Sequence, residues 1–252
     1  MPRFFVRAEA VEGGRVSFDA DETRHLSRVL RLGPGDVVLA VDGRGRELTV
    51  RLTEVGARSA AGAILDARAR RAESTLRLSL VQGLPKADKM GGIIRVATEL
   101  GVTRVVPVVT ERSIPRAAPE RSAARVSRWQ RVAREAAKQC GRAVVPDVAS
   151  PRRFAEWLSE PGPLGLLVCF WEEARAGLAD LLPPSPVDCA TLVVGPEGGL
   201  ADHEVESLRA AGAIVAGLGP RILRTETAGP VGLAVLQTRY GDLLSSTGHP
   251  AC

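Results

Sequence analysis

The chain has 252 residues, of which 45% are apolar and 25% charged, and its 34 basic and 29 acidic residues give a net charge of +5. These proportions are those of an ordinary globular protein and exclude a disordered or fibrous one. At this length the chain can form one large domain or two of ordinary size.

Targeting and metal-binding signals are absent from the sequence. Residues 1–6 contain no apolar stretch of the length that a secretory signal needs. The longest nearly apolar run, 164–171, is far shorter than the roughly 20 residues that cross a bilayer. The four cysteines and three histidines are scattered, with no C-x-x-C pair. We therefore expect a cytoplasmic protein with no metal and no membrane contact.

Residues 1–72 are predicted to form a small, barrel-like β domain. A helix is expected over 22–32, ended by Gly33-Pro34-Gly35. The turn at 42–45, Asp-Gly-Arg-Gly, is typical of a hairpin. The predicted strands cover 4–6, 15–18, 36–41, 47–54 and 62–67.

From residue 73 to 252 strands alternate with helices, which predicts a mostly parallel sheet covered on both faces. The predicted strands cover 76–84, 102–109, 164–170, 192–194 and 214–218. The predicted helices cover 87–100, 121–140, 202–211 and 228–244. The fold class is therefore α/β with a separate N-terminal β domain.

The positive charge is concentrated in residues 112–153, which hold eleven basic and three acidic residues. Such a block favours an anionic partner, most often a nucleic acid. An alternative is a general bias towards arginine, since 31 of the 34 basic residues are Arg.

The predicted helix over 121–140 is amphipathic. Its cationic face is either a solvated surface or one that contacts phosphates, and periodicity does not separate the two. The apolar face is expected to carry Val126, Trp129, Val132, Ala133, Ala136, Ala137 and Cys140.

Two loops carry the residues best suited to ligand binding. The first, 193–200 (VVGPEGGL), follows a strand and precedes a helix, and its glycines allow the backbone to approach a ligand closely. It lacks both the P-loop and the G-x-G-x-x-G pattern, which disfavours an ATPase or a dinucleotide enzyme. The plain alternative is a strand-to-helix turn.

The second loop, 218–228 (LGPRILRTETA), places two arginines, a carboxylate and two hydroxyls beside apolar residues. This mixture suits a pocket that holds an amphipathic ligand. Alternatively, Arg224 and Glu226 are a surface pair of little energetic consequence.

Both loops, together with QTRYGDL at 237–243, resemble the 16S rRNA (uracil-N3)-methyltransferase family (RsmE) of the SPOUT superfamily. The resemblance extends over nearly the whole chain. Further matching segments are HLSRVLR at 25–31, ATELGV at 97–102, TERS at 110–113 and QCGR at 139–142. The chain departs from the family pattern at Gly91 and Val96, where members often carry an acidic residue and a lysine.

The resemblance implies a PUA-like, RNA-binding β-barrel over 1–72 and a SPOUT domain over 73–252, with a trefoil knot and a homodimer interface. It also implies S-adenosylmethionine as the methyl donor, without a metal. The implied catalytic residues are Arg224, which stabilises charge on the uracil, and Glu226, which orients it or accepts a proton. The implied cofactor-binding residues are Phe170, Gly195, Glu197, Gly199, Leu218, Leu223, Arg224 and Thr225.

The implied partner is 16S rRNA in the small ribosomal subunit. For His25, a packed interior position is as compatible with the sequence as a contact with RNA. Two other functions fit part of the pattern: a SPOUT RNA methyltransferase acting on another base or a ribose 2′-hydroxyl, and a non-catalytic PUA-type RNA-binding protein. The expected RNA-binding residues are His25, Arg28, Arg31, Lys86, Arg112, Arg131, Arg134 and Arg142.

Overall fold

The computed structural model describes residues 1–69, 73–113, 120–160, 162 and 164–244, without the side chains of 120–122. The chain folds as two compact units. The first combines Met1–Glu73 with Ala137–Val145, and the second combines Ser74–Ala136 with Pro146–Cys252. Residues 137–145 thus pack with the first unit, whereas the sequence places them in the second, because their tertiary contacts are not visible in a local pattern.

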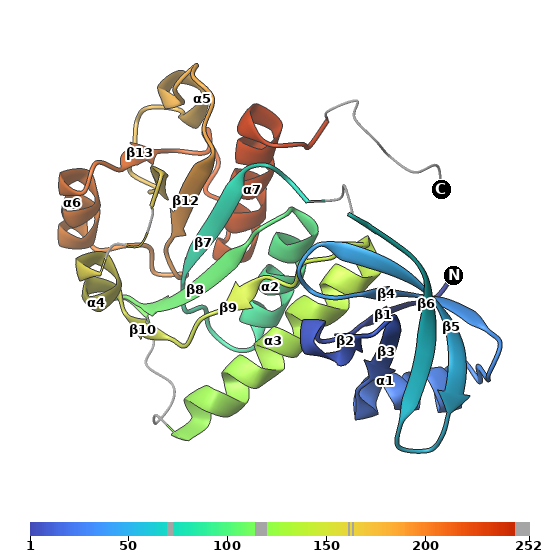
Figure 1. Ribbon diagram of the computed structural model, residues 1–252. Helices are drawn as coiled ribbons and strands as arrows, with labels where there is room; N and C mark the ends of the chain where they lie inside the picture. The colour runs from blue at the N-terminus through green and yellow to red at the C-terminus, as the bar shows by residue number, and fades with distance from the viewer. Residues whose placement is uncertain (70–72, 114–119, 161, 163, 245–252) are drawn as a thin grey trace. The chain divides into compact units, whose positions relative to one another are not determined.

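The first unit is built on a six-stranded sheet (Figure 1). Its order is β1 (Arg3–Phe5), β4 (Val37–Val41), β5 (Arg46–Val55), β6 (Ala60–Ala69), β3 (Arg15–Phe18) and β2 (Val11–Glu12). β1 pairs in parallel with β4 and the other pairs are antiparallel. All five predicted strands are confirmed in this sheet, and closure of the sheet into a barrel stays a prediction. A 3-10 turn, Ala8–Ala10, precedes β2.

The helix predicted over 22–32 is shorter and less regular than expected. α1 (Ala20–Arg24) begins early because the Asp19 side chain accepts a hydrogen bond from the Glu22 N–H at 2.8 Å. A π-helical turn, His25–Val29, follows, with the Leu30 N–H bonded to the His25 carbonyl. Arg31 then adopts a left-handed conformation (φ 54°). Single π-helical turns are frequent at functional sites.

The segment 137–145 is held in the first unit by a buried ion pair. The Arg142 side chain is only 4% exposed, and its Nε and one terminal nitrogen donate to Glu73 Oε2 at 3.0 and 2.8 Å. The other Glu73 oxygen accepts from the backbone N–H groups of Ala143 and Val144. Glu73 therefore satisfies three residues of the segment at once.

Glu73→Ala is expected to destabilise the protein by about 3 kcal/mol, because it removes the carboxylate that accepts two hydrogen bonds from the buried Arg142 guanidinium and two from the backbone of Ala143 and Val144. Urea unfolding measures the loss. The control is Glu54→Ala, which removes the exposed Arg15–Glu54 pair and should cost less than about 1 kcal/mol. Equal effects of the two variants would contradict a structural role for Glu73.

The second unit contains a seven-stranded sheet in which all recorded pairings are parallel, as predicted. The main order is β10 (Arg152–Arg153), β8 (Arg104–Val109), β7 (Arg77–Gly83), β12 (Cys189–Val194), β11 (Leu166–Phe170) and β13 (Ile214–Ala216), with β9 (Asp147–Val148) beside β8. The sequence did not predict β9 and β10, whose two residues each are too short for a periodic pattern.

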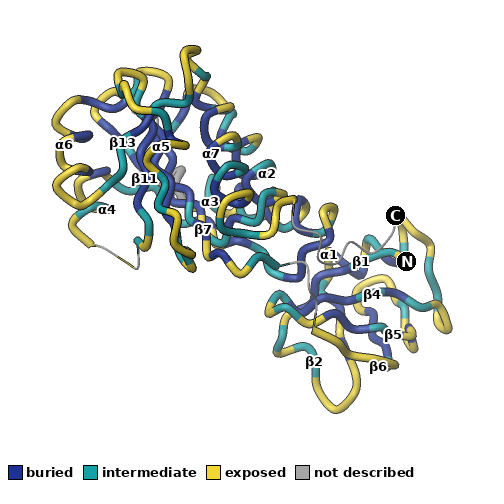
Figure 2. Tube along the Cα trace, turned by 90° about the horizontal axis from the view of Figure 1, so that it is seen from above, coloured by how far each residue is buried: buried dark blue, intermediate teal, exposed yellow. Residues whose placement is uncertain are grey.

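Helices cover both faces of this sheet (Figure 1). α4 (Phe154–Ser159) and α6 (Asp202–Ala210) pack on one face, against Val81 and Val193. α7 (Thr225–Tyr240) lies on the other face beside α2 (Lys89–Glu99). Burial on both faces leaves the central strands almost fully buried (Figure 2). α5 (Leu178–Leu181) is a single short turn.

Two predicted helices differ in detail from those observed. α7 starts three residues before the predicted start, so Thr225 and Glu226 belong to its first turn. α3 (Glu120–Cys140) buries Trp129, Ala133 and Ala136 as predicted, but Cys140 is exposed because the helix ends there. No helix in the described part of the chain is long and apolar enough to span a membrane.

Candidate functional site

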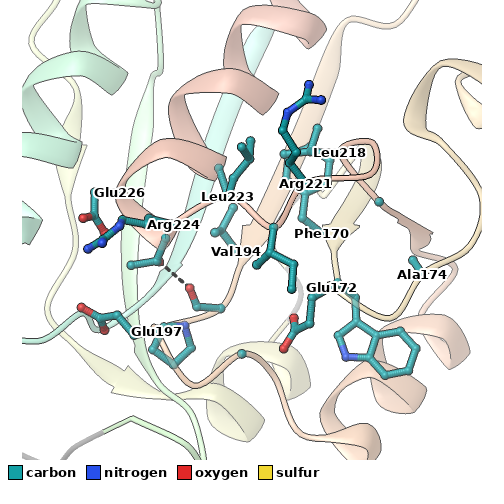
Figure 3. A pocket seen from close by; sticks show the side chains of 18 of the residues that line it. Phe170, Glu172, Ala174, Val194, Glu197, Leu218, Arg221, Leu223, Arg224 and Glu226 are labelled. Atoms are coloured by element: carbon teal, nitrogen blue, oxygen red, sulfur yellow. Dashed lines mark hydrogen bonds between the residues drawn. The ribbon is translucent and has the colours of Figure 1, made fainter.

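A cavity of about 520 Å³ lies where strands β11, β12 and β13 end (Figure 3). These strands are neighbours in the order β12-β11-β13, so the loops that leave their carboxyl ends meet at one sheet edge. In open α/β folds this edge is where ligands bind. Each loop contributes to the wall: the one after Phe170, the loop 195–199, and the segment 216–228.

The cavity brings together the residues predicted for cofactor binding and catalysis. Those predicted for RNA binding do not line it. The predicted residues that line it are Phe170, Gly195, Glu197, Gly199, Leu218, Leu223, Arg224, Thr225 and Glu226.

The loop 195–199 has a conformation that demands glycine at position 199. Gly199 has a φ of 72°, and a Cβ there would lie 2.1 Å from Glu172 Oε1. Thr225, 5% exposed at the start of α7, donates from its hydroxyl to the Gly195 carbonyl at 2.6 Å, shown dashed in Figure 3. This bond fastens the first predicted loop to the second.

Gln82, at the end of β7, supports both loops from within the core. Its side chain is completely buried. The Nε2 group lies 2.9 Å from the Thr225 hydroxyl, 3.0 Å from the Gly83 carbonyl and 3.4 Å from the Gly195 carbonyl. The Gln82 amide therefore holds Gly195 of the first loop and Thr225 of the second close together.

Lys89, the first residue of α2, bridges two carboxylates of the cavity wall. Its Nζ lies 3.0 Å from Glu197 Oε1 and 3.1 Å from Glu226 Oε2. The backbone N–H of Lys86 also donates to both Glu197 oxygens, at 3.1 and 3.0 Å. Glu197 is thus held by two groups of the segment that joins β7 to α2.

These contacts displace the pKa values of all three side chains. Burial acts to raise the pKa of Glu197, but the hydrogen bonds from Lys89 and the Lys86 N–H outweigh it and lower the pKa. Its own backbone N–H, then Lys89, lower the pKa of Glu226. Glu197 and then Glu226 raise the pKa of Lys89. Both carboxylates are therefore ionised at neutral pH.

Arg224 supplies an uncommitted guanidinium at the mouth of the cavity. It is exposed and forms no ion pair or side-chain hydrogen bond with any residue that the structure describes. Figure 3 shows its side chain beside Glu226, and its positive charge contributes to lowering the pKa of that carboxyl. Arg221 is a second exposed arginine of the wall.

Within the first unit, the π-helical turn and the residues just after it present two arginines with no ion-pair partner among the described residues. Arg28 and Arg31 are exposed, and the described residues offer neither of them an ion pair. Val29, 66% exposed, lies between them in the chain. This surface combines positive charge with the exposed apolar side chain of Val29.

His25 is half-buried and its orientation is set by Lys138. Lys138 Nζ lies 3.1 Å from His25 Nδ1 and 2.8 Å from the buried Glu22 Oε2. An ammonium can only donate, so Nδ1 accepts and a neutral His25 carries its proton on Nε2. The sequence left a packed and a surface position open, and the structure shows an intermediate one.

The remaining residues predicted for RNA binding have different surroundings. Lys86 and Arg131 are exposed, and Arg134 is half-buried. Arg112 donates to the Gly198 carbonyl at 3.3 Å. Arg142 is committed to Glu73 inside the first unit, so we correct its assignment from RNA contact to a structural role.

No group of three or more histidine, cysteine or acidic residues within the described ranges could hold a metal ion. The polar groups that line the cavity are carboxylates, the Lys89 ammonium, two guanidinium groups, the Thr225 hydroxyl and backbone amides.

Comparisons with known proteins match both parts of the chain. Residues 72–237 match the RNA methyltransferase domain family, and residues 18–65 match the RNA methyltransferase PUA domain. The fold and the cavity thus belong to an RNA methyltransferase with a PUA-like N-terminal domain.

Full-length relatives specify the family. The ribosomal RNA small subunit methyltransferase E of Bacillus subtilis is 30% identical over 237 residues, which cover 90% of this chain and 93% of that protein. The protein of the same name from Synechocystis is 34% identical, over 92% of this chain and 76% of its own length. The chain belongs to the ribosomal RNA small subunit methyltransferase E family.

Solved structures agree with this membership. The methyltransferase E of Neisseria gonorrhoeae, bound to S-adenosyl methionine, is 35% identical, with a TM-score of 0.87 over 96% of this chain and 99% of that one. A putative methyltransferase of Legionella pneumophila, in complex with the same cofactor, is 29% identical with a TM-score of 0.87, over 96% of this chain and 98% of its own.

Sequence reasoning missed two residues that organise the cavity, Gln82 and Lys89. Gln82 is a polar residue directly after the apolar pair Leu80 and Val81, near the end of a strand, which was a usable signal. Lys89 is one of three lysines in an arginine-rich chain. Nothing in its local sequence indicates that it meets carboxylates more than 100 positions away.

Proposed function

We propose that this chain transfers a methyl group from S-adenosylmethionine to N3 of a specific uridine in 16S rRNA of the small ribosomal subunit. The observation that carries the proposal is the single cavity that gathers both predicted ligand loops beside Arg224, in a chain of this family. The relatives are named as methyltransferases of the small-subunit ribosomal RNA, which supports this substrate for the chain.

The residues of the cavity fit the cofactor. Phe170, Leu218 and Leu223 offer apolar surface suited to an adenine ring, and the loop 195–199 offers backbone groups at close approach. Glu172 and Glu197 place negative charge in the wall, which suits a cationic ligand. When bound, S-adenosylmethionine supplies an electrophilic methyl group on a sulfonium sulfur.

Uracil N3 carries a proton at neutral pH, and this proton must leave when N3 is methylated. Negative charge develops on the uracil oxygens as this proton passes to solvent water, and positive charge held at that point lowers the barrier. Arg224 is the free guanidinium available for this task. Glu226 has a lowered pKa and is a weak base, so we assign it the orientation of the uracil.

The RNA is proposed to contact the π-helical turn through Arg28, Arg31 and the Nε2 side of His25. In the second unit, the proposed RNA contacts are Lys86, Arg112, Arg131 and Arg134. The lack of ion-pair partners for Arg28 and Arg31 in the described structure supports this assignment, because free guanidinium groups contact phosphates without breaking existing pairs.

The double variant Arg28→Met/Arg31→Met is expected to weaken binding to an rRNA fragment. Because each lost phosphate contact on single-stranded RNA removes about 0.7 from the slope of log K against log salt, the slope should become shallower by roughly 1.4. Fluorescence anisotropy over a series of KCl concentrations measures it. The control is Arg15→Met, which removes an exposed arginine already paired with Glu54. An unchanged slope in the double variant would remove the turn from the RNA surface.

We also propose a closed PUA-like barrel for the first unit, a trefoil knot in the SPOUT domain, a homodimer and a cytoplasmic location. The support is family membership together with the topology of the two sheets.

The proposed reaction is tested with labelled S-adenosylmethionine and small ribosomal subunits from cells that lack the gene. Labelled 3-methyluridine, detected by mass spectrometry of nucleosides, is the expected product. Another methylated nucleoside would contradict the assignment to uracil N3 while leaving the enzyme class intact. Transfer to ribose would favour the alternative 2′-hydroxyl target.

A further inference from the structure

Lys89 contacts a carboxylate of each predicted ligand loop. It starts α2, whereas Glu197 belongs to the loop after β12 and Glu226 to the first turn of α7. All three side chains line the cavity. Its ammonium therefore connects three separate elements at the cavity mouth. Gln82 connects two of them, the loop after β12 and the start of α7, from within the core.

We propose that Lys89 is a positioning residue for methyl transfer, whose ammonium holds Glu197 and Glu226 together and thereby closes the cofactor cavity into its binding shape. This inference rests on the proposed function, because it concerns the cavity assigned to S-adenosylmethionine.

The physical reason is the repulsion that Lys89 prevents. Two carboxylates that share one ammonium lie close together, and without the cation they repel each other across a partly desolvated space. The side chains are only 32%, 22% and 31% exposed for Lys89, Glu197 and Glu226, so water screens the repulsion incompletely.

No other cation of the described surroundings replaces Lys89. Lys86 holds Glu197 through its backbone N–H, while its side chain is exposed. Arg224 contributes charge near Glu226 but forms no ion pair with it in the described structure. Asp88, beside Lys89 in the chain, is paired with Arg128 of α3. Among the described residues, only Lys89 contacts both carboxylates.

The test compares the affinity of full-length variants for S-adenosylmethionine by isothermal titration calorimetry between pH 5 and pH 8. Lys89→Met removes the cation, Lys89→Arg retains it, and Arg95→Met removes a cation from the outer face of the same helix. Arg95 is 61% exposed and faces Glu99, away from the cavity. Thermal unfolding of each variant shows that it is folded.

Lys89→Met is expected to weaken binding about fivefold at pH 8, the size of effect that a partly screened ion-pair network supports. The lowered pKa values of Glu197 and Glu226 rise when the cation is lost. Acidification to pH 5 then protonates part of the pair, relieves the repulsion and should bring the affinity within about twofold of the wild type. Lys89→Arg and Arg95→Met should stay within about twofold at every pH.

Equal affinity of Lys89→Met and the wild type at pH 8 would overturn the inference alone, since the wild type would still bind the cofactor. A loss that is the same at pH 5 and pH 8, or one that Lys89→Arg shares, would also overturn it, because packing and not charge would then be responsible. A wild-type protein that does not bind S-adenosylmethionine would overturn the proposed function, and this inference with it.

Discussion

Arg224→Met is expected to lower kcat for rRNA methylation by about a hundred- to a thousandfold, which is the usual cost of removing one preorganised group that stabilises developing charge. The Kd for S-adenosylmethionine should change little. The guanidinium is exposed at the cavity mouth and forms no ion pair within the described structure, so its loss breaks no internal contact.

Single-turnover methylation at saturating cofactor and RNA measures this effect separately from binding. The matched comparison is Arg221→Met, which removes the other exposed arginine of the cavity wall. If general positive charge were responsible, both variants would be slowed to the same extent. A wild-type rate for Arg224→Met would exclude Arg224 from the chemistry.

Gly232→Ala is expected to destabilise the protein by about 1–3 kcal/mol through overpacking, although alanine is the better helix former. Gly232 lies in α7 where the helix crosses the sheet. A Cβ there would lie 2.2 Å from Phe170 Cε2 and 2.8 Å from Leu192 Cδ2. Because Phe170 lines the cavity proposed to hold the cofactor, its displacement should also weaken binding of S-adenosylmethionine.

The control for Gly232 is Gly92→Ala in α2, where no atom outside the adjoining backbone of the helix lies within 4 Å of the added Cβ. This substitution is expected to stabilise the protein by about 1 kcal/mol, the ordinary helix propensity difference. Chemical denaturation measures both changes. The same sign for the two variants would contradict the proposed close contact between α7 and Phe170.

The local pattern of the sequence determined most of the secondary structure. Strands of alternating or continuous apolar residues, such as β3 and β7, were predicted almost to the residue, because period and burial are local properties of a segment. The two loops were located from their glycine and polar residues, because composition is also a local property of a segment. Their meeting in one cavity follows from a general property of parallel sheets, whose carboxyl ends lie at one edge.

The irregular features were decided by packing. The π-helical turn after α1 replaces a regular helix, while Leu26 is completely buried in the core of the first unit. Residues 137–145 join the first unit because Glu73 pairs with Arg142, a contact across 69 positions of the chain. An arginine that the sequence presents as an RNA contact is thus part of the interior.

The sequence by itself determined the α/β class and the position of the two loops, because apolar periodicity and glycine content are local. Its resemblance to the family supplied the nine predicted residues that line the cavity. Only the tertiary structure revealed Gln82 and Lys89 as the groups that hold those loops. Their partners lie more than 100 positions away in the chain, and hydrogen bonds and ion pairs depend on distance in space, which no local pattern records.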